Sequence, residues 1–264
     1  RSRGLGDVYK RQLLNNTTGN SNSAFGYQSL LSNTTSSNNT SVGYQSLYGN
    51  TASNNTAVGY QAGYTNSTGA TNVAVGFSAL YSNTTASNNT AVGSQAAYNT
   101  TGTSNAAFGA NTLYTNSSGA YNTALGMSAL FSNTTASQNI AVGYQAAYYN
   151  TTGAYNTTIG NYTLIFNTAG SANASVGYQA GYNNVGSNNT YLGTYAGYNS
   201  RGTSNTYVGQ SSGSQTGSAA SCTGSYNVGV GDTALQTLSS GNNNTAVGYQ
   251  SLYTTSTASY NTAV

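Results

Sequence analysis

The sequence predicts an all-β fold, a parallel β-solenoid (a β-roll) of about fifteen coils of 16–17 residues. Three observations predict it. One motif, Asn-Thr-Ala-Val-Gly-Tyr-Gln-Ala-Leu-Tyr with a polar spacer after it, recurs along the chain at steps of 16 or 17 residues, with one step of 22. Its fourth residue is always apolar, and its fifth is glycine in every complete copy. So short a period suits stacked coils, because one coil buries too little surface to be stable alone.

We number the leading asparagine of each copy as position 0. A helical solenoid needs long segments of 3.6-residue period without a glycine in each repeat, and a propeller blade needs about 40 residues, so both are disfavoured. The copies begin at Asn22, Asn39, Asn55, Asn72, Asn89, Asn105, Asn122, Asn139, Asn156, Asn173, Asn189, Asn205, Asn227, Asn244 and Asn261.

Position 3 is never polar, and we predict that it forms the interior of the coil. Positions 1 and 3 of a strand share one face, and position 2 takes the other. Position 2 is usually small, which suggests room for a neighbouring chain. The predicted core residues are Val42, Val58, Val75, Val92, Phe108, Leu125, Val142, Ile159, Val176, Leu192 and Val208.

Position 4 is predicted to be the corner that ends the first strand. A glycine that never varies among the complete copies indicates a positive φ or a close approach of two backbones. These corner glycines include Gly43, Gly59, Gly76, Gly93, Gly109, Gly126, Gly143, Gly160, Gly177 and Gly193.

Positions 5–9 are predicted to form a second short strand, although apolar residues at consecutive positions leave its inside and outside undetermined. The spacer, rich in Asn, Ser, Thr and Gly, has the composition of turns. Stacked coils place identical residues about 4.8 Å apart, so we expect ladders of asparagine and columns of tyrosine.

The composition argues against an enzyme. The chain has no histidine, one cysteine and only seven charged residues, so general acid–base catalysis lacks its usual groups. We therefore predict no catalytic, cofactor-binding or metal-binding residues. The formal net charge of +3 comes from residues 1–12 and gives no evidence for nucleic-acid binding. No apolar run approaches the length that spans a membrane.

The repeat begins at Leu13, and nothing before it fits the motif. Residues 1–12 resemble a translated sequencing-adapter end, so we predict a disordered scar there and one solenoid domain over residues 13–264, truncated at both ends. The step of 22 residues predicts a loop insertion within residues 210–226. It contains Cys222, a lone thiol that we interpret as inert, with an interchain disulfide as the alternative.

The motif resembles a known family. Asn-Thr-Ala-Val-Gly, and Asn-Ile-Ala-Val-Gly at Asn139–Gly143, are similar to the head repeats of trimeric autotransporter adhesins of the YadA type. That resemblance implies a left-handed β-roll that forms a homotrimer, although the period here is longer than in that family. The version with Gly-Tyr-Gln-Ala-Leu-Tyr also resembles repeats of bacterial surface proteins and phage tail fibres.

We therefore expect a non-enzymatic structural or adhesive rod, either extracellular or at the cell surface. Its tyrosine ring faces and its Gln, Asn and Thr side chains would contact host-surface glycans or matrix proteins. One alternative is a phage tail-fibre shaft, located on the virion. Another is an ice-binding solenoid, disfavoured because Val, Ile and Ala interrupt the threonines of position 1. The many Asn-x-Ser/Thr triplets are interpreted as turn composition rather than glycosylation sites.

Overall fold

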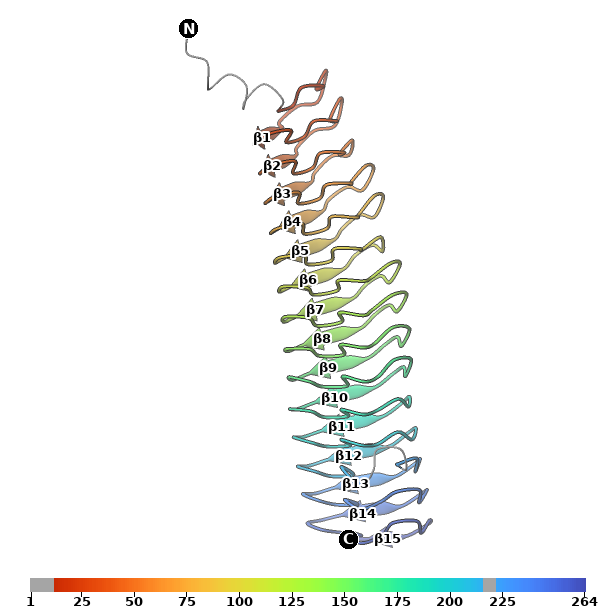
Figure 1. The fold of residues 1–264 in the computed structure, drawn as a ribbon. Coiled ribbons are helices and arrows are strands. Elements are labelled where there is room, and N and C mark those ends of the chain that lie inside the picture. The colour runs from red at the N-terminus through yellow and green to blue at the C-terminus, as the bar shows by residue number, and fades with distance from the viewer. Residues whose placement is uncertain (1–11, 216–221) are drawn as a thin grey trace. The chain divides into compact units, whose positions relative to one another are not determined.

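The predicted fold class is confirmed. The computed structural model describes residues 12–215 and 222–264, so most of the predicted scar, residues 1–11, lies outside the described residues. Within them the chain is a parallel β-solenoid of about 14 turns, with coils about 17 residues apart and no helix (Figure 1). Near the start of the described residues, the backbone N–H of Leu13 donates to the carbonyl of Ser29 in the next coil (3.2 Å).

Each coil contributes one strand of three residues, at positions 1–3. The chain forms two compact units, one comprising Arg1–Ser128 and Asn133–Thr135, the other Ala129–Ser132 and Ala136–Val264. Successive strands pair in parallel within each unit. The strands are β1 Ser23–Phe25, β2 Thr40–Val42, β3 Thr56–Val58, β4 Val73–Val75, β5 Thr90–Val92, β6 Ala106–Phe108 and β7 Thr123–Leu125 in the first unit, and β8 Ile140–Val142, β9 Thr157–Ile159, β10 Ala174–Val176, β11 Thr190–Leu192, β12 Thr206–Val208, β13 Val228–Val230, β14 Thr245–Val247 and β15 Thr262–Ala263 in the second.

The prediction that position 3 forms the interior is wrong. Position 2 is buried instead, as at Ala57 and Ala91, which are 0% exposed. The coil interior is thin, so a small residue on the strand leaves room for a larger side chain that enters from the opposite wall. The two-residue period then turns positions 1 and 3 outward. Of the predicted core residues, Val75, Val92, Val142, Val176 and Val208 are half-buried, and Val42, Val58, Phe108, Leu125, Ile159 and Leu192 are exposed.

The same finding removes one reason given for a trimer. The small residues at position 2 make room inside their own coil, and they face no neighbouring chain.

The corner glycines adopt the predicted conformation. From Gly43 to Gly193 their φ angles lie between 132° and 138°. Backbones also approach closely at this corner. A Cβ built on Gly76 would lie 2.3 Å from the carbonyl oxygen of Gly93 in the next coil. Both reasons for a glycine therefore hold at the same position.

Positions 5–9 do not form the predicted second strand. The residues at positions 6 and 8 have positive φ, as at Gln45 (53°) and Leu47 (47°). The backbone therefore alternates between left-handed and right-handed conformations and forms turns instead of a strand. The backbone carbonyl of Leu47 accepts a hydrogen bond from the N–H of Asn50 (3.2 Å). The N–H of Leu47 donates to the carbonyl of Ala62 in the next coil (2.9 Å). Positions 7 and 8 consequently face inward, and positions 5 and 6 face outward.

Two ladders of buried asparagine run through the interior. At position 0, the N–H of Asn55 donates to Oδ1 of Asn39 (2.9 Å), and the N–H of Asn72 donates to Oδ1 of Asn55 (2.8 Å). At position 11, Nδ2 of Asn66 donates to Oδ1 of Asn50 (2.7 Å), and Nδ2 of Asn83 donates to Oδ1 of Asn66 (3.0 Å). Because buried amides need partners, these ladders hold neighbouring coils in register.

In the apolar part of the interior, the side-chain volumes at positions 2 and 8 compensate each other. Where position 2 is alanine or serine, position 8 can hold a buried leucine, as at Leu80. Where position 2 is Tyr191 or Tyr207, both fully or almost fully buried, position 8 is Gly197 or Gly213. A Cβ on Gly197 would lie 2.4 Å from Cδ1 of Tyr191, and one on Gly213 would lie 2.5 Å from Cδ2 of Tyr207. Each tyrosine ring therefore fills the space that a leucine fills in other coils.

The predicted insertion, residues 210–226, is described in part. Gly213 still pairs with the next coil, since its N–H donates to Ala234 (2.8 Å), and Cys222 accepts from the N–H of Arg201 (2.8 Å). The middle of the predicted insertion, residues 216–221, lies outside the described residues. The Cys222 thiol is 2% exposed and lies 2.5 Å from Oε1 of Gln215, which favours its interpretation as inert.

Candidate functional site

The outward residues form straight columns, because the strands pair without a register shift. Thr40 lies beside Thr56, and Val42 lies beside Val58. We call the outward surface of positions 1 and 3 the sheet face. Its position-3 column stays apolar in both units, and its bulkiest members are well exposed, with Phe25 at 63% and Leu125 at 48%. An apolar column of this kind, exposed in some coils and half-buried in others, is a candidate interaction surface.

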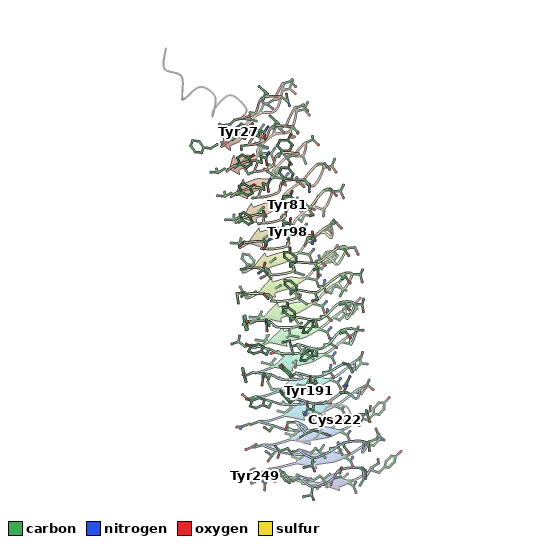
Figure 2. The ribbon with its side chains drawn as sticks, viewed as in Figure 1. Tyr27, Tyr81, Tyr98, Tyr191, Cys222 and Tyr249 are labelled. Atoms are coloured by element: carbon green, nitrogen blue, oxygen red, sulfur yellow. The ribbon has the colours of Figure 1, made fainter. Side chains whose placement is uncertain are left out.

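A second surface is formed by positions 5, 6 and 9, and we call it the aromatic surface. In the first unit, position 5 carries the stack Tyr27, Tyr44, Tyr60 and Phe77, with ring centroids 5.2–5.5 Å apart. Position 9 carries Tyr48, Tyr64, Tyr81, Tyr98 and Tyr114, with centroids 5.0–5.2 Å apart. Figure 2 labels Tyr81 and Tyr98, whose ring planes differ by 3°.

Stacking hides the ring faces that we expected to be available for ligands. A tyrosine inside a stack, such as Tyr44 or Tyr81, has another ring against each face. Its edge and its hydroxyl remain outward. The columns therefore offer rows of hydroxyl groups, and a flat apolar platform remains only where a stack ends.

The second unit fills the aromatic surface differently. Position 5 carries a tyrosine in three coils and polar residues in the others, and in two of those others position 6 supplies a ring instead, Tyr162 or Tyr195. Tyr162 makes edge contacts with Tyr144 and Tyr178, with centroids 5.1 and 6.2 Å apart, and Tyr195 contacts Tyr178 at 5.6 Å. Tyr195 also contacts the position-9 residue Tyr198 at 5.8 Å, so positions 6 and 9 belong to one surface.

Position 6 of the first unit carries amides. Nε2 of Gln45 donates to Oε1 of Gln28 (2.7 Å), and Nε2 of Gln61 donates to Oε1 of Gln45 (2.8 Å). Each glutamine in this ladder keeps a second N–H and an oxygen lone pair for other partners. In the sequence this ladder was visible only as a repeated Gln, because the motif does not show that position 6 points outward.

The surfaces are almost uncharged. Among the described residues, the only formally charged side chains are Arg201 and Asp232. Burial, and then the neighbouring Tyr81, raise the pKa of Tyr64 above its ordinary value. In the interior, burial strongly raises the pKa of Tyr191, whose hydroxyl donates to Oδ1 of Asn184 (3.1 Å).

Other site chemistry is not seen in the described part of the chain. Residues 12–215 and 222–264 hold no group of three or more His, Cys, Asp or Glu side chains placed to bind a metal ion. No helix in those ranges is long and apolar enough to cross a membrane. Asn33, in an Asn-x-Thr triplet, is 0% exposed and donates to Oδ1 of Asn16 (3.0 Å), in keeping with a structural role.

Comparisons with known proteins assign no family. No protein-family model matches the chain, and no curated protein matches it. The resemblance to adhesin head repeats stays an expectation from the sequence.

Proposed function

We propose that this chain is a non-enzymatic repeat segment of a surface-displayed protein, which presents periodic side-chain columns and associates with copies of itself. The observation that carries the proposal is the arrangement of the side chains. Asn ladders and packed apolar residues fill the interior, so the side chains available to a partner stand on the sheet face, on the aromatic surface and on the spacer turns, where Tyr121 and Tyr155 are 63% exposed. A bacterial adhesin and a phage tail fibre both use such segments, and flanking sequence that encodes a membrane anchor or a chaperone domain distinguishes them.

A non-enzymatic role agrees with the residue types present. Catalysis by general acids and bases needs groups that exchange protons near neutral pH. The sequence has no histidine and no glutamate, and the described cysteine, Cys222, is buried against an amide. Binding through many weak, identical contacts needs no such groups and gains affinity from repetition.

Self-association is proposed to occur through the sheet face, with a homotrimer as the expected state. Position 3 exposes apolar side chains in coil after coil, including Val42 (38%), Val58 (37%) and Phe108 (39%). Water disfavours such a column by about 25 cal/mol for each Å² of apolar surface. Packing the sheet faces of several copies together would remove that cost.

The test replaces three neighbouring residues of the sheet face, Val58→Ser, Val75→Ser and Val92→Ser, in the full chain. Because these side chains point outward, the circular dichroism spectrum should keep its β shape while light scattering shows a trimer becoming a monomer. The matched control, Thr35→Ala with Thr85→Ala in the exposed spacer, should remain a trimer. A wild-type chain that is monomeric at micromolar concentration would refute self-association.

A second candidate function is ice binding, because the structure turns the threonines of position 1 outward. Thr40 and Thr56 align across neighbouring strands beside the valine column, so hydroxyl and methyl groups share one surface that could order water. Phe108 and Leu125 project from the same surface. Thermal hysteresis and ice-crystal shaping by the full chain test this function, and their absence removes it.

A further inference from the structure

The position-5 aromatic stack of the first unit is interrupted over two coils. Phe77 is followed at this position by Ser94, Ala110 and then Met127. Backbone hydrogen bonds show that these residues are neighbours. The backbone N–H of Gln95, the residue after Ser94, donates to the carbonyl of Phe77 (2.8 Å). In the same way, the N–H of Asn111 donates to the carbonyl of Ser94 (2.9 Å), and the N–H of Ser128 donates to the carbonyl of Ala110 (2.9 Å). We call Phe77, Ser94, Ala110 and Met127 the column gap.

Phe77 presents an open ring face to this gap. One face stacks on Tyr60, with centroids 5.3 Å apart and planes 7° from parallel. The other face looks toward Ser94, which is too small to cover it. Phe77 is accordingly 52% exposed, compared with 45% for Tyr60 and 43% for Tyr44, which have rings on both sides. The far end of the gap is Met127, which is 49% exposed.

The column gap differs from the interruption of the position-5 aromatic residues at Asn161 in the second unit. In the second unit, Asn161 stands at position 5, but Tyr162 follows it and its ring contacts the tyrosines of both neighbouring coils. Within the gap, position 6 holds Gln95 and Asn111 instead. An apolar platform therefore meets two half-buried amides at this place.

We propose that the column gap binds a neutral oligosaccharide, with one pyranose ring stacked on Phe77. The C–H bonds on the face of a pyranose are weakly positive and suit the negative face of an aromatic ring. Gln95 and Asn111 offer both donors and acceptors to sugar hydroxyls. The proposal deepens the adhesive role proposed above, since it names the class of ligand that the aromatic surface holds.

The length and charge of the gap favour this ligand class. Three coil spacings separate Phe77 from Met127, about 14 Å at the usual spacing of parallel strands. That length accommodates two or three linked sugars. An aromatic side chain from a partner protein would cover Phe77 but leave both amides without partners. Among the described residues the charged side chains, Arg201 and Asp232, both belong to the second unit, so the described part of the first unit offers an anionic glycan no counter-charge.

The experiment measures binding of three neutral probes, cellotriose, maltotriose and chitotriose, to the full chain by saturation-transfer NMR and calorimetry. The double variant Ser94→Tyr with Ala110→Tyr continues the stack through the gap as far as Met127, so it covers the open face of Phe77 and leaves no new open ring face there. We expect it to weaken binding at least about tenfold, because one stacked ring is lost, without lowering the melting temperature. Phe77→Ala should weaken binding to a similar extent.

The matched control is Asn161→Tyr, which adds a tyrosine at the same motif position outside the gap and should bind like the wild type. The inference is overturned if none of the three probes binds, if the double variant Ser94→Tyr with Ala110→Tyr binds as well as the wild type, or if N-acetyl-tryptophanamide binds at Phe77 in preference to the sugars. The light-scattering result for the sheet face is independent, so loss of sugar binding with an intact trimer refutes this inference alone.

Discussion

Gly197→Ala tests the packing between positions 2 and 8 with one methyl group. A Cβ at Gly197 would lie 2.4 Å from both Cδ1 and Cε1 of Tyr191 and 2.9 Å from its Cζ. The Tyr191 ring is fully buried and stacks on Tyr207 at 5.9 Å, so it has little freedom to move away. Overpacking of this kind costs about 1–3 kcal/mol of unfolding free energy.

Backbone strain does not explain such a loss, because other coils place alanine at the same motif position with a similar φ. Ala97 and Ala147 both have φ of 51°, compared with 60° for Gly197. Gly63→Ala is therefore the matched control. Gly63 also has φ of 60°, and its Cβ would meet only the terminal Cδ2 of Leu47, at 2.9 Å. A flexible side-chain end can move, so this substitution should change stability by less than about 0.5 kcal/mol.

A double-mutant cycle completes the test. Tyr191→Ala alone should cost about 3–5 kcal/mol through the cavity it leaves. Combined with Gly197→Leu, it rebuilds the Ala and Leu pair found in other coils, and the two changes should compensate by a coupling energy of about 1–3 kcal/mol. Chemical denaturation followed by circular dichroism gives the four stabilities. If Gly197→Ala melts like the wild type, or if the two changes are additive, the tyrosine does not occupy the space at position 8.

Three further predictions follow from the geometry. Gly76→Ala should destabilise the fold by about 3 kcal/mol in denaturation, because φ of 137° and a backbone oxygen 2.3 Å from the new Cβ both oppose it. Above pH 10 stability should fall in a pH-dependent melt, since the unfolded tyrosines ionise while burial holds the pKa of Tyr191 and Tyr207 above the ordinary value of 10.0; replacing both by phenylalanine should flatten that decline. Val142→Asp should keep a β spectrum yet lose the trimer in light scattering, since position 3 points outward.

The sequence was sufficient to predict the solenoid, its coil length and its corner glycines. Each depends on a local requirement repeated in every copy. Gly76, for example, satisfies both a positive φ and a backbone contact with the next coil, and no other residue type satisfies both. A requirement that is set by the backbone leaves the same residue at the same position, so repetition within one chain reveals it.

The orientation of the strand was predicted wrongly because an apolar position was equated with a buried one. Val58 and Phe108 are apolar and exposed, whereas the buried positions include asparagines such as Asn55. In a thin coil the backbone itself occupies much of the cross-section, and the amide ladders satisfy it from within. An outward apolar column does not fill such a coil, in keeping with the self-association proposed for the sheet face.

The second strand was predicted wrongly although the sequence held evidence against it. Strands favour β-branched residues, but position 8 is leucine, alanine or glycine in every copy that reaches it. A β-branched side chain is strongly disfavoured at positive φ, and position 8 has positive φ throughout, as at Leu113 with 51°. The absence of Val, Ile and Thr from this position was therefore a sign of the left-handed conformation.

The inside of the coil could also have been found from volumes. Tyrosine occurs at position 2 in two copies, Tyr191 and Tyr207, and both copies have glycine at position 8. The next copy has Gly229 at position 2 and Leu235 at position 8. Residues that exchange volume in this way share a space, whereas position 3 varies from valine to phenylalanine with no compensating change at position 8. Compensation between positions, more than apolar character at one position, identifies the interior of a repeat too thin for large side chains from both walls.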